Sequence, residues 1–142
     1  MPGRRRTPPP CARPAGPTPV AVALDAGTAR DATPLDQDLE RLAQRSLAMY
    51  QDVAKAFAET GEDCKAATAR LGQLTAEYRD VATANAKVLQ DGRANELRAA
   101  LDPHSGELDR AAKAVVQSPT MSRCSQDRAF ARAFDELHEA SP

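Results

Sequence analysis

The sequence predicts an all-α protein, an antiparallel up-down four-helix bundle preceded by a disordered arm rich in Pro and Arg. Apolar residues recur at steps of three and four from about residue 35 onward, with no competing strand pattern. Eight of the eleven prolines lie at or before Pro34, which marks a boundary in composition. We therefore expect an arm or linker over 1–33 and a helical bundle over 34–140. Helices are predicted at about 34–60, 63–91, 93–117 (broken near 103) and 120–139.

The arm has no apolar periodicity and is rich in residues that cannot bury surface, which is typical of a disordered segment. It carries five arginines against Asp25 and Asp31, whereas the rest of the chain carries 14 basic and 18 acidic residues. The predicted bundle thus lacks the basic excess that binding to a phosphate backbone requires. We expect no nucleic-acid partner.

The arm also bears on targeting. Its best apolar run, Val20 to Leu24, is shorter than the roughly 7–15 apolar residues of an export signal, and Cys11 follows three prolines instead of a lipoprotein-type apolar run. No segment is long enough to span a membrane. The chain as written is therefore expected to carry no export signal. The arm resembles the proline-rich linker that follows the signal in exported bacterial proteins, and this resemblance, with the cysteine pattern described below, leads to the hypothesis that the start site is misplaced.

The first helix is predicted to begin at Thr33-Pro34, where a threonine cap precedes a proline in the first turn. Gly61 is expected to end it. Its inward stripe consists of Leu35, Leu39, Leu42, Met49, Val53 and Phe57.

The second helix has an unbroken seam of alternating three- and four-residue steps, typical of coiled-coil packing. The seam consists of Cys64, Ala67, Leu71, Leu74, Tyr78, Val81, Asn85 and Val88. Asn85 is its polar member and is interpreted as a register or water-bonding residue in preference to a ligand contact.

The third helix carries a similar stripe of Leu97, Leu101, His104, Leu108, Ala111 and Val115. Proline inside a helix removes a hydrogen bond, so a kink or break is predicted at 102–106 around Pro103. The fourth helix is predicted to follow Ser118-Pro119 and to turn Cys124, Phe130, Phe134 and Leu137 inward.

Cys64 and Cys124 lie near the starts of the second and fourth helices, which share one end of an antiparallel bundle. A disulfide there would close about 60 residues and stabilise the fold by about 4 kcal/mol. In a square bundle these helices are diagonal, which leaves the Cα atoms about 9 Å apart where a disulfide needs less than about 7 Å. The bond therefore requires converging helix ends or an arrangement that is not square. The alternative is two buried free thiols in the cytosol, and Cys11 would be free or intermolecular.

No pattern of catalytic or metal-binding residues is found. The chain has no CxxC, HExxH, CxxCH, nucleophile-elbow or phosphate-loop motif. Met49, His104 and His138 could supply haem ligands, but Met49 lies on a helix seam, where methionine usually fills space. We predict no enzyme activity, no cofactor and no metal.

The segments CKAATARLGQL and MSRCSQDRAFARAFDEL make residues 35–139 resemble small uncharacterised two-cysteine helical proteins of bacteria that are predicted to be exported or lipoprotein-like. The resemblance implies a periplasmic or secreted location and a structural disulfide, and it implies no activity. The expected function is a non-enzymatic structural or interaction domain with a protein or envelope partner. The alternatives are a ligand- or haem-binding bundle and a cytosolic helical adaptor with free thiols. The oligomeric state stays open.

Overall fold

Helices make up every regular element that the computed structural model describes, which covers residues 33–139. Residues 1–32, which make up all but the last residue of the arm predicted over 1–33 and include Cys11, lie outside the described residues, as do the last three residues. The all-α prediction is confirmed for the described part. Its elements are η2 (Leu35–Gln37), α3 (Leu39–Thr60), α4 (Cys64–Glu77), α5 (Arg79–Gln90), α6 (Ala94–Leu101), η3 (Asp102–His104), α7 (Ser105–Val116), α8 (Pro119–Cys124) and α9 (Arg128–His138).

Helix α3 starts later than predicted. The expected start at Pro34 is replaced by the short 3₁₀ turn η2, and α3 begins after Asp38, whose Oδ1 accepts a hydrogen bond from the Arg41 amide at 3.1 Å. The η2 turn is held from a distant part of the chain, because the Arg93 guanidinium donates to the Asp36 carbonyl at 2.9 Å. The other end agrees with the prediction, since Gly61 follows the last turn with a positive φ of 56°.

The predicted helix 63–91 is not continuous but divides at Tyr78 into α4 and α5. The backbone there turns to φ −104° and ψ 22°, away from helical values. Arg45 on α3 donates to the Glu77 carbonyl at 3.4 Å and pairs with Asp80 at 2.7 Å, so it bonds both sides of the division. Apart from the half-buried Cys64, the seam on both halves is buried as predicted. The division is bonded by a residue more than 30 positions away in the sequence.

Tyr78 itself points into the core at this division. Its side chain is 3% exposed, and its hydroxyl donates to Asp52 Oδ2 on α3 at 2.5 Å. The Arg45 guanidinium lies 4.7 Å from the ring centroid. Burial raises the pKa of the Tyr78 phenol far above its ordinary value, and the hydrogen bond to Asp52 raises it further.

The last two predicted helices are also divided. The segment 93–117 consists of α6 and α7 with the 3₁₀ turn η3, which contains Pro103, between them. The segment 120–139 is interrupted after Cys124, because Asp127 caps a new helix and accepts from the Phe130 amide at 3.0 Å. The short helix α8 begins at Pro119 behind the Ser118 cap, at the dipeptide that the sequence indicated.

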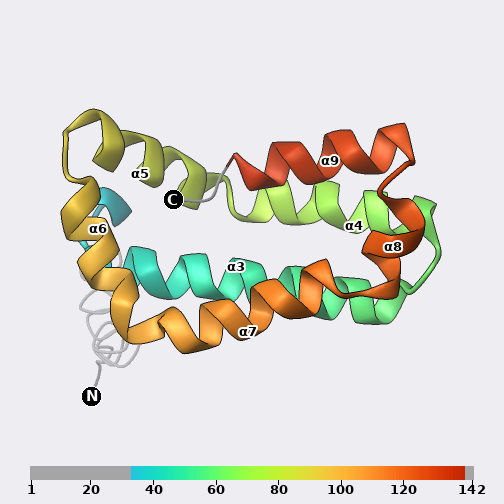
Figure 1. Cartoon of the computed structure of the whole chain (residues 1–142). Coiled ribbons are helices and arrows are strands. Elements are labelled where there is room, and N and C mark those ends of the chain that lie inside the picture. The colour runs from blue at the N-terminus through green and yellow to red at the C-terminus, as the bar shows by residue number, and fades with distance from the viewer. Residues whose placement is uncertain (1–32, 140–142) are drawn as a thin grey trace, which may run out of the picture. The chain divides into compact units, whose positions relative to one another are not determined.

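The helices pack in an order that differs from the expected square. In Figure 1, α3 and α7 run side by side in the same direction, and α4 and α9 do the same in the opposite direction. Helix α3 also packs on α4 and α6. The predicted second and fourth helices are therefore neighbours and not diagonal. The core between them is formed chiefly by Leu42, Met49, Val53, Phe57, Leu71, Leu74, Tyr78, Val81, Val88, Leu97, Val115, Phe130 and Leu137.

Candidate functional site

An apolar groove of about 450 Å³ lies between α3, α7 and α9. Helix α3 contributes Met49, Tyr50 and Val53 to its lining, and Leu101 at the end of α6 contributes one further apolar side chain. Met49 and Val53 are one turn apart, so they form one stripe of α3. We call this feature the apolar groove.

Helix α7 forms the second side of the apolar groove. Leu108, Ala112 and Val115 follow one another at helical spacing and face the groove, and Val116 lies next to them with 66% of its surface exposed. The sequence placed Leu108 and Val115 in the core stripe but missed Ala112 and Val116. The sequence did contain a signal for them, because Ala112 and Val116 each directly follow or lie one turn from a residue of the predicted stripe and are apolar themselves.

Helix α9 closes the groove with Phe134, Leu137 and His138. Phe134 belongs to an aromatic cluster in which its ring centroid lies 6.3 Å from that of Phe57 and 6.1 Å from that of Phe130. The His138 ring stacks on Phe134 at 5.8 Å. This wall of the groove therefore rests on core aromatics, of which Phe130 is 1% exposed.

Polar atoms reach the apolar groove from Tyr50 and His138 and from two α7 residues, Ser105 and Asp109. Asp109 also pairs with the exposed Lys113 at 3.2 Å, an ion pair within α7. An apolar lining with a few polar groups is the usual composition of a site for a small organic ligand.

The three haem-ligand candidates are divided by the structure. Met49 and His138 line the same apolar groove, from α3 and α9. His104 does not, because its Nε2 lies 3.2 Å from Glu40 Oε1 beside η3. Within residues 33–139 no three His, Cys, Asp or Glu side chains converge as metal ligands would. Asn85 is buried and does not line the apolar groove.

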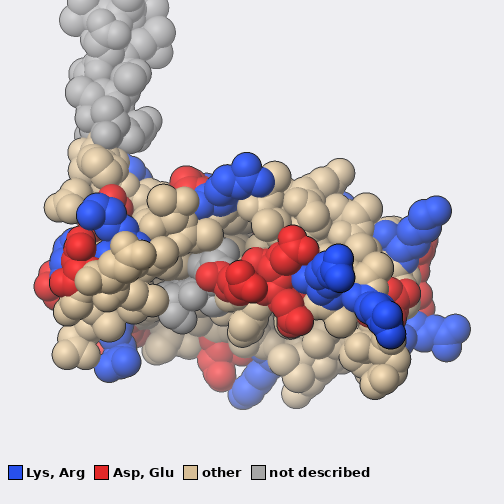
Figure 2. Space-filling view, turned by 90° about the horizontal axis from the view of Figure 1, so that it is seen from above, with Lys and Arg blue, Asp and Glu red and all other residues tan. Residues whose placement is uncertain are grey.

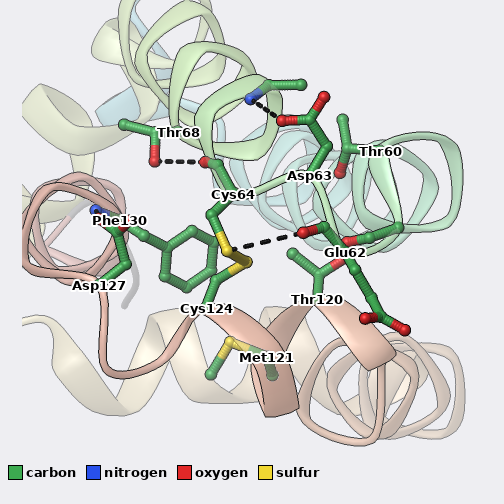
Figure 3. Close-up of a disulfide and its surroundings, with 12 residues drawn as sticks. Thr60, Glu62, Asp63, Cys64, Thr68, Thr120, Met121, Cys124, Asp127 and Phe130 are labelled. Atoms are coloured by element: carbon green, nitrogen blue, oxygen red, sulfur yellow. Dashed lines mark hydrogen bonds between the residues drawn. A yellow bond between two sulfur atoms is a disulfide. The ribbon is translucent and has the colours of Figure 1, made fainter.

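The two cysteines meet at the opposite end of α9 from His138. The Sγ atoms of Cys64 and Cys124 are 2.04 Å apart and their Cα atoms 5.4 Å, so the predicted approach is confirmed. The expected obstacle is absent because α4 and α9 are neighbours and α8 is a separate helix. Figure 3 shows the Phe130 ring beside the two sulfur atoms. Because Phe130 also stacks on Phe134, the disulfide contacts the aromatic cluster behind the apolar groove.

Thr120, which the sequence analysis missed, attaches α8 to α3. Its side chain is fully buried, and its hydroxyl lies 3.0 Å from the Phe57 carbonyl and 2.5 Å from the Gly61 carbonyl, at the C-terminal end of α3 (Figure 3). The Phe57 carbonyl already accepts from the Gly61 amide at 2.9 Å, whereas the Gly61 carbonyl lies past the last turn of α3. The buried Thr120 hydroxyl therefore gives the Gly61 carbonyl a donor. A threonine in the first turn of a predicted helix gave no sign of this contact.

No helix in the described part of the chain combines the length and apolar character needed to cross a bilayer. Comparison of the sequence with protein-family models and with curated proteins, and of the structure with solved structures, finds no match.

Proposed function

We propose that residues 35–139 form an up-down four-helix bundle that acts without catalysis as a binding domain, and that the apolar groove holds its ligand. The groove itself is the observation that carries this proposal. Its volume of about 450 Å³ is within the range of small-molecule sites, roughly 300–1,000 Å³. The ligand is an elongated or flat apolar molecule with one polar end.

The arrangement of the lining supports this ligand class. The side chains of Leu108, Val115 and Phe134 offer only apolar contact, whereas Ser105 and Asp109 lie on exposed turns of α7. An apolar body would be buried along the helices while its polar end stays near these groups. Burial of apolar area contributes roughly 25 cal/mol per Å², which favours a ligand that fills the groove lengthwise.

A location outside the cytoplasm of a bacterium is part of the same proposal. It is supported by the resemblance to exported two-cysteine helical proteins and by two cysteines at disulfide distance, since such bonds persist in oxidising compartments. Intact mass after thiol alkylation, with and without reductant, tests it on protein from the native compartment. Two alkylated thiols at Cys64 and Cys124 without reductant would favour a cytosolic adaptor instead.

The ligand proposal is tested with a fluorescent fatty acid and with an anilinonaphthalene dye. Ala112→Phe places a large ring in the groove and is expected to reduce binding at least tenfold. Ala114→Phe is the matched control, because Ala114 is an exposed residue of the same helix outside the lining. Equal binding by both variants, or no binding by the unmodified protein, would contradict the proposal.

Haem is a second candidate ligand, favoured by Met49 and His138 on two facing helices of one groove. Protein prepared with haem present would then show a Soret band. The band is expected to shift in Met49→Leu and to be lost in His138→Ala, whereas His104→Ala leaves it unchanged. Absence of the band removes this candidate and leaves the apolar-ligand proposal intact.

A further inference from the structure

We infer that a second groove, between α4 and α9, binds a compact phosphate-bearing anion. It measures about 700 Å³ and is lined by Arg79 at the start of α5, by Arg128 and Arg132 of α9, and by small residues that include Gly72 and Ala129. We call it the basic groove. It is separate from the apolar groove. Helix α9 contributes Phe134 and His138 to the apolar groove and Arg128 and Arg132 to the basic groove.

The three arginines have no acidic partner within residues 33–139. None of them forms an ion pair or a side-chain hydrogen bond with another residue of the described part. Several arginines elsewhere on the same acidic body are paired with carboxylates, namely Arg41, Arg45, Arg70 and Arg93. Three positive charges thus line one hollow with no neutralising side chain bonded to them, which favours an anion.

The order of charges along α9 is not explained by helix stability. Arg128 and Arg132 lie in its N-terminal half, and Asp135, Glu136 and Glu139 follow toward its C-terminal end. The helix dipole favours acidic residues at the start of a helix, a preference that only the Asp127 cap meets in α9. Figure 2, which looks down on the molecule, shows basic side chains beside a cluster of acidic ones. An anion in the basic groove would offset the unfavourable charge at the start of α9.

The floor of the basic groove leaves room for close approach. Gly72 lies inside α4, where glycine weakens a helix relative to alanine, yet an added Cβ would meet no atom within 4 Å. Packing therefore does not require this glycine. The two hydroxyls on the floor are already used, because Thr68 bonds the Cys64 carbonyl at 2.7 Å and Thr75 bonds the Leu71 carbonyl at 2.9 Å. Recognition is left to the guanidinium groups.

Phosphate fits this set of donors better than a monovalent ion does. The planar guanidinium presents paired N–H donors that match two oxygens of one phosphate. Glu136 also lines the groove, so the four charged side chains of the lining leave a formal excess of two positive charges, which a ligand with two negative charges would neutralise. Such a group occurs in soluble phosphate monoesters and diphosphates and in the phosphomonoester head group of phosphatidic acid.

The test is a titration of the full chain with inorganic pyrophosphate, followed by NMR of backbone amides and arginine side chains at constant ionic strength. Arg132→Gln and Arg128→Gln are each expected to weaken binding at least fivefold, and Glu136→Gln to tighten it at least twofold. Arg110→Gln is the control, since Arg110 on α7 also has no ion pair in the described part of the chain but lies outside the groove. A loss in Arg110→Gln equal to that in Arg132→Gln would show a general charge effect and overturn the proposal.

A second arm separates the two sources of phosphate. Co-sedimentation is measured with vesicles that contain phosphatidic acid and with phosphatidylcholine vesicles. Binding to phosphatidic acid that Arg132→Gln abolishes, without a response to pyrophosphate, supports the site with a lipid head group as ligand. A pyrophosphate response without sedimentation supports a soluble ligand. Neither response, or responses that the arginine variants leave unchanged, would overturn the site while leaving the apolar groove untouched.

Discussion

Tyr78 donates its hydroxyl proton to Asp52, and this bond joins α3 to the point where α4 ends and α5 begins. Tyr78 is buried and Asp52 is half-buried. If the bond is removed, water can therefore replace it only in part. Together with the Arg45 contacts, this bond fixes α3 to the point where the predicted second helix divides.

Tyr78→Phe is expected to lower the free energy of unfolding by about 1–3 kcal/mol, because it removes the hydrogen bond and leaves the Asp52 carboxylate without this donor. Urea denaturation measures the change. Asp109→Asn is the control, since it disrupts only the exposed pair with Lys113 and should cost less than about 0.5 kcal/mol. Equal losses in the two variants would mean that the Tyr78 bond does not contribute.

The raised pKa of Tyr78 predicts a loss of stability at alkaline pH. The unfolded chain releases the phenolic proton near the ordinary pKa of about 10, whereas the folded protein retains it to higher pH. The contribution is therefore complete below about pH 10 and decreases as the pH rises above it. Urea midpoints between pH 9 and 11 should fall more steeply for the unmodified protein than for Tyr78→Phe, and parallel curves would contradict this assignment.

Replacing both Cys64 and Cys124 by Ser is expected to destabilise the protein by about 4 kcal/mol, as the chain-entropy model gives for a sequence separation of 60 residues. The comparison is made in a Cys11→Ser background, which leaves no third thiol for exchange. Guanidinium midpoints of the two proteins give the difference. Reductant should lower the guanidinium midpoint of the protein that retains Cys64 and Cys124 and leave that of the serine variant unchanged. A lower midpoint in both proteins would contradict the assignment to the disulfide.

Thr120→Val keeps the shape of the side chain and removes its hydroxyl, so the carbonyls at the end of α3 lose a buried donor. A loss of about 1–3 kcal/mol is expected in thermal or urea unfolding. Thr83→Val is the matched control, because the Thr83 hydroxyl is exposed and bonds the Arg79 carbonyl within its own helix. If both variants lose the same stability, the threonine does not attach α8 to α3.

Local patterns predicted the helical class and most buried positions. Leu71, Leu74 and Val81 are buried where the alternating steps placed them, and Ser118-Pro119 opens α8 as expected. These features depend on neighbours within one or two turns, which a sequence displays directly.

Features that depend on distant residues were missed. The division at Tyr78 requires Arg45 and Asp52, and the position of η2 requires Arg93. The side-by-side packing of α4 and α9 was not predicted either, because seams show which face is buried but not which helix covers it. Both grooves lie beside α9, so neither could be placed without that arrangement.

The sulfur link between Cys64 and Cys124 turns the stretch from α4 through α8 into a closed covalent ring. A protease that cuts the backbone once inside this ring, for example at the turn around Gly92, produces no separate fragments, because the two new pieces remain tied together. Such a nicked molecule keeps all its helices in one particle and can still hold its shape. In surroundings rich in proteases, a first cut would therefore be tolerated where an open chain would be lost.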